Sequence, residues 1–462
     1  MHTTVKTLGD LRESGYQSRS VRDELRTNMV RMIRSNETLF PGLHGYQETV
    51  IPQVQNAILA GHDILLLGER GQAKTRLARS LTSMLDEWIP VVSGSETHDD
   101  PFSPVSAMGR AILSEHGEST PIAWLHRSER FAEKLATPDT SIADLVGEVD
   151  PIKIAEGRYL SNEEVIAFGL IPRTNRGIFN LNELPDLGER IQVGLLNILE
   201  ERDVQIRGFT VRLPLDILVV ASANPEDYTN RGRIITPLKD RFGSQIRTHY
   251  PSTTEQELRI VDQEQKSTDI PGVDLFVPQY MRDLVAAISH EARIHPKVNA
   301  RSGVSVRMTV ANYEAIIANA QRRAILTGSS NAVPAIVDLS AISASMMGKI
   351  EFDTWEANDD VRVVDDIISE SMHRVGSSLS SQDWATSLLA SIETGKHITV
   401  DPTSSAEQAL ATMALGDSIL TGSQSFSEHH SAAAAVSAIQ FALEYWFRTG
   451  RIRKDQYEYA SA

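Results

Sequence analysis

The chain has 462 residues, enough for two to three domains, and its 41% hydrophobic and 23% charged residues are typical of a globular protein. A net charge of −16 without a long basic block argues against nucleic acid as the main partner, and the absence of cysteine excludes disulfides and thiolate metal sites. No apolar run approaches the length of a membrane span and the first residues are polar, so we expect no anchor, no signal peptide and a cytoplasmic location.

The first 40 residues are predicted to form a polar lead followed by a helix. Apolar residues recur there at helical spacing, namely Val21, Leu25, Met29 and Ile33. A turn at 43–46 and a periodic segment at 50–59 then lead into an apolar strand at 64–67. The turn is equally well placed to contact an adenine ring or to be purely structural.

A glycine-bearing loop follows this strand and opens the next periodic segment. Its sequence is Gly68-Glu69-Arg70-Gly71-Gln72-Ala73-Lys74-Thr75. Strand, glycine turn and Lys-Thr at a helix start are the context that a phosphate-binding loop requires. Lys74 would contact the β- and γ-phosphates of a nucleotide and the Thr75 hydroxyl would bind Mg²⁺. We therefore expect nucleotide contacts from Gly68, Glu69, Arg70, Gly71, Gln72, Ala73, Lys74, Thr75 and Arg76.

One residue of this loop departs from the general pattern. Ala73 stands where a glycine usually precedes the lysine. Alanine is the smallest replacement, and we expect the loop to keep its shape if φ at Ala73 is negative.

The segment at 91–150 is predicted to be rich in loops. Its basic residues Arg127, Arg130 and Lys134 are interpreted as a solvent-exposed face, because charged side chains are rarely buried.

A second motif, Gly177-Ile178-Phe179-Asn180-Leu181-Asn182-Glu183, has the pattern of a buried strand that ends in two polar residues. Ligands of α/β sheets collect at the carboxyl ends of strands, so Asn182 and Glu183 are expected beside the loop at 68–75. Glu183 could orient an attacking water, and Asn182 with Thr75 could hold Mg²⁺. Such strands usually carry Asp where this one has Asn182, so weaker Mg²⁺ binding or slower turnover is expected.

Residues 191–201 are predicted to be helical, with Val193, Leu196 and Leu199 facing a core. Residues 204–213 alternate around a glycine, which is typical of a hairpin. The buried strand at 217–221 then runs into Ser222-Ala223-Asn224-Pro225, where Asn224 could hold a water together with Glu183. Further on, Arg241 lies close to Gly243.

The order of these motifs resembles the AAA+ ATPases, and within them the MoxR and magnesium-chelatase I-subunit group. The resemblance covers about residues 40–310 and includes the Ala-Lys-Thr end of the loop and the hairpin. It implies that Asn224 is the sensor-1 residue and that Arg241 is an arginine finger acting on a neighbouring subunit. It also implies that Arg307, in Gly303-Val304-Ser305-Val306-Arg307, is the sensor-2 residue. Arg241 could instead cap a helix, and Arg307 could be an ordinary surface arginine.

The resemblance implies an α/β fold: a P-loop AAA+ αβα nucleotide-binding domain with a parallel sheet, an all-helical lid and a helical C-terminal region. Helices are expected near 254–266, 278–294, 308–326 and 432–448. The expected boundaries are 1–40 for the lead, 41–250 for the nucleotide-binding domain, 251–330 for the lid and 331–462 for the C-terminal region.

Three functions follow from these features. The first is an ATP- and Mg²⁺-dependent ring motor, a hexamer by resemblance, that remodels a client or inserts a metal ion with a von Willebrand factor A-type partner. The second is a nucleotide-gated scaffold with little hydrolysis, because of Asn182. The third is a transcription activator. The sequence shows no clear helix-turn-helix, and its acidic charge disfavours this function.

Overall fold

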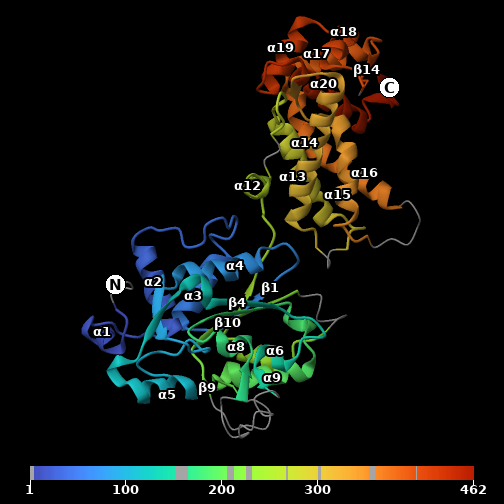
Figure 1. The fold of residues 1–462 in the computed structure, drawn as a ribbon. Helices are drawn as coiled ribbons and strands as arrows, with labels where there is room; N and C mark the ends of the chain where they lie inside the picture. The colour runs from blue at the N-terminus through green and yellow to red at the C-terminus, as the bar shows by residue number, and fades with distance from the viewer. Residues whose placement is uncertain are drawn as a thin grey trace. The chain divides into compact units, whose positions relative to one another are not determined.

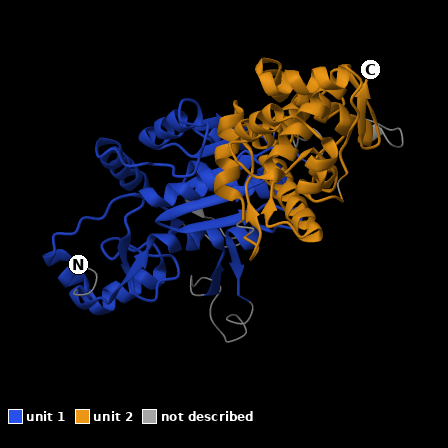
Figure 2. Ribbon diagram, turned by 90° about the horizontal axis from the view of Figure 1, so that it is seen from above, with its two compact units in different colours: residues 1–249 blue, residues 250–462 orange. Residues whose placement is uncertain are grey.

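The structure is a computed structural model in which the chain forms two compact units, residues 1–249 and 250–462 (Figure 2). The structure describes residues 5–150, 165–204, 213–224, 232–266, 269–299, 303–352, 359–401 and 403–462.

The first unit is built on a five-stranded sheet in the order β11-β1-β10-β7-β4. All neighbouring strands of this sheet run parallel. The strands are β1 (Ile64–Leu67), β4 (Phe131–Leu135), β7 (Gly177–Asn182), β10 (Ile217–Ala223) and β11 (Ser244–Arg247). Parallel sheets need cover on both faces, which explains the nearly continuous apolar character of the three central strands.

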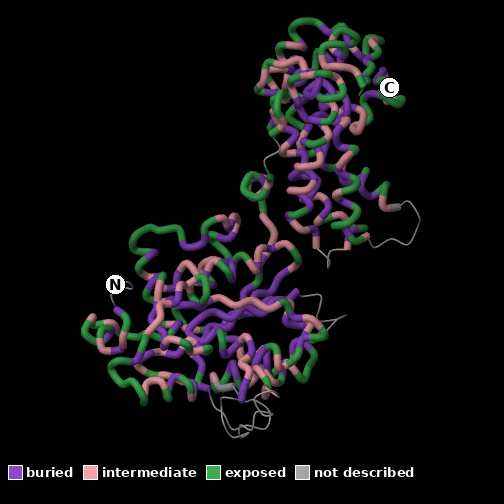
Figure 3. Tube along the Cα trace, viewed as in Figure 1, coloured by how far each residue is buried: buried purple, intermediate pink, exposed green. Residues whose placement is uncertain are grey.

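Helices cover each face of this sheet (Figure 1). On β1, Ile64 and Leu66 pack with one set of helices, while Leu65 and Leu67 pack with the other set. The first set is α2 (Val21–Arg34), α3 (Val50–Ala60) and α4 (Lys74–Ser80); the second is α6 (Ile142–Leu145), α8 (Leu170–Arg173), α9 (Glu189–Glu200) and α11 (Thr236–Arg241). Figure 3 shows the buried strands between these helices. The predicted three-layer αβα fold is confirmed.

Shorter elements complete the first unit. The helices are α1 (Leu8–Glu13) and α5 (Ala107–His116); the paired strands are β2 (Trp88–Val92) with β3 (Ile122–His126), β5 (Gly147–Val149) with β6 (Ile166–Phe168), and β8 (Asp203–Val204) with β9 (Leu213–Pro214). The antiparallel β8–β9 pair forms the base of the predicted hairpin, whose residues 205–212 lie outside the described residues.

Two apolar residues that the sequence analysis groups with the apolar faces of their helices are exposed to solvent. Ile33 of α2 is 44% exposed and Val193 of α9 is 53% exposed. On α9 the buried face consists of Gln192, Leu195, Ile198 and Leu199. Helical spacing along that face turns Val193 toward solvent, so the prediction for it was wrong.

The predicted basic face at 127–134 was also wrong at its central residue. Arg130 is only 1% exposed, and its two terminal nitrogens donate to the Glu24 carboxylate of α2 at 2.7 and 2.6 Å. Its Nε donates to the carbonyl of Arg176 at 2.8 Å. A buried guanidinium needs such partners, and this pair joins α2 to the residue directly before β4.

The second unit is predominantly helical, as predicted. Its helices are α12 (Thr254–Glu264), α13 (Gln279–Ile294), α14 (Val306–Thr327), α15 (Ile342–Met347), α16 (Asp359–Gly376), α17 (Asp383–Glu393), α18 (Ala406–Met413), α19 (Asp417–Phe426) and α20 (Ala432–Arg448). Short strands that the sequence analysis does not anticipate are β12 (Asp274–Leu275), β13 (Asn331–Ala332), β14 (Ile398–Thr399), β15 (Ile452–Asp455) and β16 (Glu458–Ser461). One apolar cluster runs from Val261 to Tyr459 and includes Trp446. A boundary near residue 330 remains a prediction.

Buried charged groups tie elements of this unit together. The Glu444 carboxylate of α20 accepts hydrogen bonds from Arg448 Nε, Lys454 Nζ and the Tyr459 hydroxyl, each at 2.8 Å. Burial by itself would raise the pKa of Glu444, but Lys454, Arg448 and Tyr459 outweigh it and lower the pKa.

Among the described residues, no helix combines the length and apolar character needed to cross a bilayer.

Candidate functional site

The register of the sheet brings the predicted motifs to one edge. Leu67 of β1 lies opposite Ala223 of β10, and Ala221 of β10 lies opposite Leu181 of β7. Because the strands are parallel, their carboxyl ends meet at this edge. The backbone N–H of Gly68 donates to the carbonyl of Ala223 at 3.1 Å, which joins the start of the loop to the end of β10.

Two glycines of the 68–75 loop are needed for different reasons. A Cβ atom at Gly68 would collide with the side chains of Thr248 and Gln72, so this position has no room for a larger residue. Gly71 instead has a φ of 77°, in the left-handed region that favours glycine.

Ala73 differs from its prediction. Its φ is 52° and its ψ is 21°, so the residue is left-handed rather than at negative φ. This conformation costs an alanine about 1–2 kcal/mol. Packing of Ala73 against the apolar cluster that contains Leu77 opposes that cost.

Lys74 is buried at the first position of α4, with 7% of its surface exposed. Its ammonium group donates to the carbonyls of Gly68 and Glu69, the latter at 2.9 Å. The charge therefore lies against the backbone of the loop that precedes it.

A second set of contacts fixes the loop from behind. The Gln72 side-chain oxygen accepts from the backbone N–H of Glu69 at 3.1 Å and from the Thr248 hydroxyl at 2.7 Å. The Tyr46 hydroxyl lies 2.7 Å from the Gln72 carbonyl. Burial raises the pKa of Tyr46 to about 12, so this hydroxyl stays protonated and can donate. The 43–46 turn thus has a structural contact with the loop, while its adenine contact remains a prediction.

Asn182 is the centre of the polar contacts at the end of β7. Its side-chain oxygen lies 3.4 Å from the Thr75 hydroxyl and 3.2 Å from the Ser222 hydroxyl. Its side-chain nitrogen donates to Glu133 of β4 at 2.6 Å. Glu183 follows with a left-handed φ of 54°, and its backbone N–H donates to Ser222 at 3.3 Å.

The oxygen atoms at this point suit Mg²⁺. A threonine hydroxyl and an amide oxygen are hard ligands, and Mg²⁺ in nucleotide sites takes few protein ligands beside phosphates. Within the described ranges there is no group of three or more His, Cys, Asp or Glu residues able to hold a metal by themselves. Thr75 and Asn182 could therefore hold Mg²⁺ only together with phosphate oxygens and water.

Of the remaining predicted residues, one is buried at the sheet edge, one is paired with a carboxylate, and the others are exposed. Asn224 is 1% exposed and directly follows β10, at the same edge as the loop. Arg241 ends α11, where its Nε donates to Glu200 of α9 at 2.8 Å and its Nη1 to the Pro237 carbonyl at 2.8 Å. Arg307 is exposed on α14, in the second unit. Arg70 and Arg76 are exposed on the loop and on α4.

Sequence reasoning missed two members of this site. Ser222 joins Asn182 to Glu183, and its place directly before Ala223 and Asn224 is a usable signal. Glu133 lies on β4 and reaches Asn182 only because β4 is the neighbour of β7 in the sheet. No local motif marks that neighbour.

Comparisons with known proteins agree with this geometry. A magnesium-chelatase ChlI subunit from Guillardia theta is 30% identical over 239 residues, which cover 49% of this chain and 62% of that protein. The ChlI subunit of a Nostoc species is 27% identical over 249 residues, 52% of this chain and 62% of that protein. The chain thus spans about three fifths of the relatives it matches.

Two further comparisons are looser. A model of the magnesium-chelatase BchI–BchD complex from a cryo-EM reconstruction aligns at 19% identity, with a TM-score of 0.36, over 71% of this chain and 98% of that one. A superposition as loose as this adds nothing to the assignment. The model of the sigma-54 interaction domain matches residues 154–241.

The sheet order, the loop at 68–75 and the polar ends of β7 and β10 define a P-loop nucleotide-binding protein of the αβα class. In sequence, the chain is similar to the magnesium-chelatase I subunits of the AAA+ ATPases.

Proposed function

We propose that this protein binds ATP with Mg²⁺ at the 68–75 loop and hydrolyses it to ADP and phosphate. The observation that carries the proposal is the convergence of three strand ends on this loop. It brings Lys74, Thr75, Asn182, Glu183 and Asn224 to one edge of the sheet.

Each residue has a distinct part in this reaction. The Lys74 ammonium, held against the loop, would exchange its carbonyl partners for phosphate oxygens. Thr75 and Asn182 would hold Mg²⁺, which neutralises charge that develops on the phosphates. Glu183 would orient the attacking water and accept its proton, with Asn224 holding that water from β10.

We further propose that the active unit is a ring, by family resemblance a hexamer. Arg241 would act on the nucleotide of a neighbouring subunit and Arg307 would act from the second unit. In a single chain Arg241 is paired with Glu200, so a neighbour's phosphates would have to displace that carboxylate. Sedimentation of the purified protein with and without ATP tests the assembly.

The work coupled to hydrolysis would be the remodelling of a client or the insertion of a metal ion. Matched relatives are named as magnesium-chelatase subunits, and a partner with a metal-binding von Willebrand factor A-type domain would fit this role. A pull-down with a Glu183→Gln variant, which should bind ATP and stay assembled, tests for such a partner.

Phosphate release tests the hydrolysis itself. Wild-type protein should release phosphate in a Mg²⁺-dependent manner, and Glu183→Gln should reduce the rate by about 10²–10⁴-fold, as expected for loss of a general base. Wild-type turnover equal to that of Glu183→Gln, with ATP still bound, would favour the alternative of a nucleotide-gated scaffold. The amide at Asn182 is the observation behind that alternative.

The sigma-54 interaction-domain match supports a second alternative, an AAA+ transcription activator. The net charge of −16 opposes it, because DNA binding needs clustered cations. Salt-resistant binding of this chain to duplex DNA in an electrophoretic shift assay would support the activator over the motor.

A further inference from the structure

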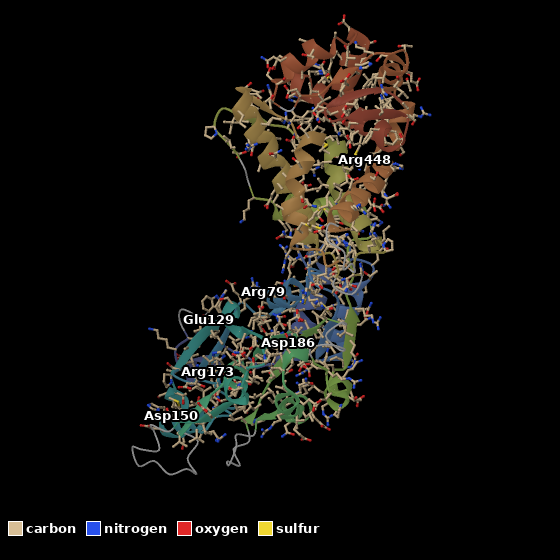
Figure 4. The ribbon with its side chains drawn as sticks, turned by 90° about the vertical axis from the view of Figure 1, so that its right-hand side faces the viewer. Arg79, Glu129, Asp150, Arg173, Asp186 and Arg448 are labelled. Carbon is tan, nitrogen blue, oxygen red and sulfur yellow. The ribbon has the colours of Figure 1, made fainter. Side chains whose placement is uncertain are left out.

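The edge strand β4 places a carboxylate beside the amide that replaces the usual aspartate. One oxygen of Glu133 accepts a hydrogen bond from the Asn182 side-chain nitrogen at 2.6 Å. The other oxygen accepts from Arg79 Nε of α4 at 2.8 Å; Arg79 is labelled in Figure 4. β4 pairs with β7 so that Glu133 lies opposite Asn180 and Leu135 lies opposite Asn182.

This contact fixes which way the Asn182 amide points. A carboxylate can only accept hydrogen bonds, so the amide nitrogen must face Glu133. The amide oxygen is then turned toward Thr75, 3.4 Å from its hydroxyl. The Ser222 hydroxyl and the Asn180 amide, at 3.2 and 3.3 Å, donate to the same oxygen. The acceptor that could bind Mg²⁺ or its water is thus held in place from three sides.

The contact also supplies negative charge. An amide oxygen attracts a divalent cation less strongly than a carboxylate does, and Glu133 lies one hydrogen bond behind it. The Glu133 side chain is 24% exposed, so solvent screens it only partly. Arg79 is 63% exposed, and an ion pair so open to solvent neutralises the carboxylate only weakly.

We propose that Glu133 is the carboxylate of the Mg²⁺ site: a positioning residue that orients the Asn182 oxygen toward Thr75 and supplies the charge that Asn182 lacks. The acidic group of the site has in effect moved from β7 to the neighbouring strand. This inference rests on the proposed binding of nucleotide with Mg²⁺ at the 68–75 loop.

Metal binding gives the test a readout other than turnover. Mn²⁺ in place of Mg²⁺ can be titrated by electron paramagnetic resonance into the full chain with ADP bound, while a fluorescent ADP analogue in EDTA reports nucleotide binding without metal. Glu133→Gln keeps the shape and an acceptor for Asn182 but removes the charge. Its Mn²⁺ dissociation constant should rise about 10-fold, since losing an outer partner of a metal ligand costs about 10–100-fold. The affinity for the fluorescent ADP analogue in EDTA should be unchanged.

Three further variants separate the effect of charge from the effect of folding. Arg79→Gln removes the other partner of the same carboxylate, and its Mn²⁺ dissociation constant should stay equal or fall. Asn182→Asp alone puts a second carboxylate against Glu133 and loses the hydrogen bond, so it should gain little affinity. Glu133→Gln with Asn182→Asp moves the charge back to β7 and should restore Mn²⁺ binding to within about threefold of wild type, as a coupled pair does in a double-mutant cycle.

The outcomes distinguish this inference from the function on which it rests. If wild type binds ADP and Mn²⁺ but Glu133→Gln binds Mn²⁺ equally well, Glu133 has no part in the metal site. The same conclusion follows if the double substitution is no better than Glu133→Gln. If wild type binds no nucleotide, the proposed function fails, and this inference fails with it. Thermal melting of each variant checks that the fold is retained.

Discussion

Both units bury polar side chains, but they use them differently. In the second unit, the carboxylates of Glu444 and Glu257 are surrounded by cationic and hydroxyl donors, with Glu257 held by Arg293 at 2.7 Å through each oxygen. At the sheet edge of the first unit, Asn182 and Ser222 are linked at 3.2 Å, and the Lys74 ammonium donates to the backbone carbonyls of Gly68 and Glu69. Burial of polar groups therefore does not identify a site. The difference lies in the partners: the carboxylates of the second unit accept from charged side chains, whereas the Lys74 ammonium donates to neutral backbone carbonyls.

The largest functional effect in the first unit is expected from Arg241→Ala. If the guanidinium acts on a neighbour's phosphates, turnover should fall about 10³–10⁵-fold while ATP affinity is retained. Steady-state phosphate release and ATP titration measure the two quantities. Glu200→Gln is the control, because it removes the partner of Arg241 but keeps the guanidinium; its turnover should be unchanged or higher. Full turnover in Arg241→Ala would show that the residue only caps α11.

Lys74→Ala should have the next largest effect. Loss of charge-assisted bonds to phosphate, worth roughly 3 kcal/mol, should weaken ATP binding at least about 100-fold. Calorimetric titration measures the affinity, and the melting temperature should stay within a few degrees, because the hydrogen bonds of the lysine to Gly68 and Glu69 lie within one loop. Unchanged affinity would remove the loop from the nucleotide site.

Glu444→Gln should show the opposite behaviour. Removing the charge leaves the half-buried Lys454 and Arg448 without this carboxylate, and the free energy of unfolding should fall by about 3 kcal/mol. Urea unfolding followed by tryptophan fluorescence measures the change, and ATP affinity should be unaltered. Glu458→Gln, whose carboxylate is 49% exposed beside His397, is the matched control and should change stability by less than about 1 kcal/mol. If Glu444→Gln lost ATP affinity while Glu458→Gln kept it, the contrast between a stabilising cluster in the second unit and a ligand site in the first would be wrong.

Acid should reproduce part of that loss. Because the folded-state pKa of Glu444 lies below its ordinary value of 4.5, its charge stabilises the protein above that pH. The stabilisation disappears as the pH falls through the lowered folded-state pKa. The stability difference between wild type and Glu444→Gln, measured by urea unfolding at a series of pH values, should therefore shrink below about pH 4.5. A difference that stays constant into acid would show that the lost interaction is not electrostatic.

The sequence predicted those parts of the site that local patterns encode. The loop at 68–75 and the polar ends of the strands at 177–183 and 217–224 each have a signature within a few residues, and the parallel sheet then places them together. The αβα fold and α20 (Ala432–Arg448) followed from the same kind of pattern.

What the sequence did not predict depends on distant partners. Arg130 resembles a surface residue until Glu24, far away in the chain, is placed beside it by α2. Glu133 gains its meaning only from the neighbouring position of β4 and β7. The positive φ of Ala73 depends on packing against an apolar cluster rather than on its own preference.

The pair formed by Arg130 and Glu24 has a practical consequence for expression. A truncated protein that begins after the helix at Val21–Arg34 would strip the carboxylate from a guanidinium that is only 1% exposed. Such a stranded cation costs roughly 3–5 kcal/mol, a large share of what a domain has to spare. The helix at Val21–Arg34 is therefore part of the folded first unit, and shortened versions that begin after it should be markedly less stable.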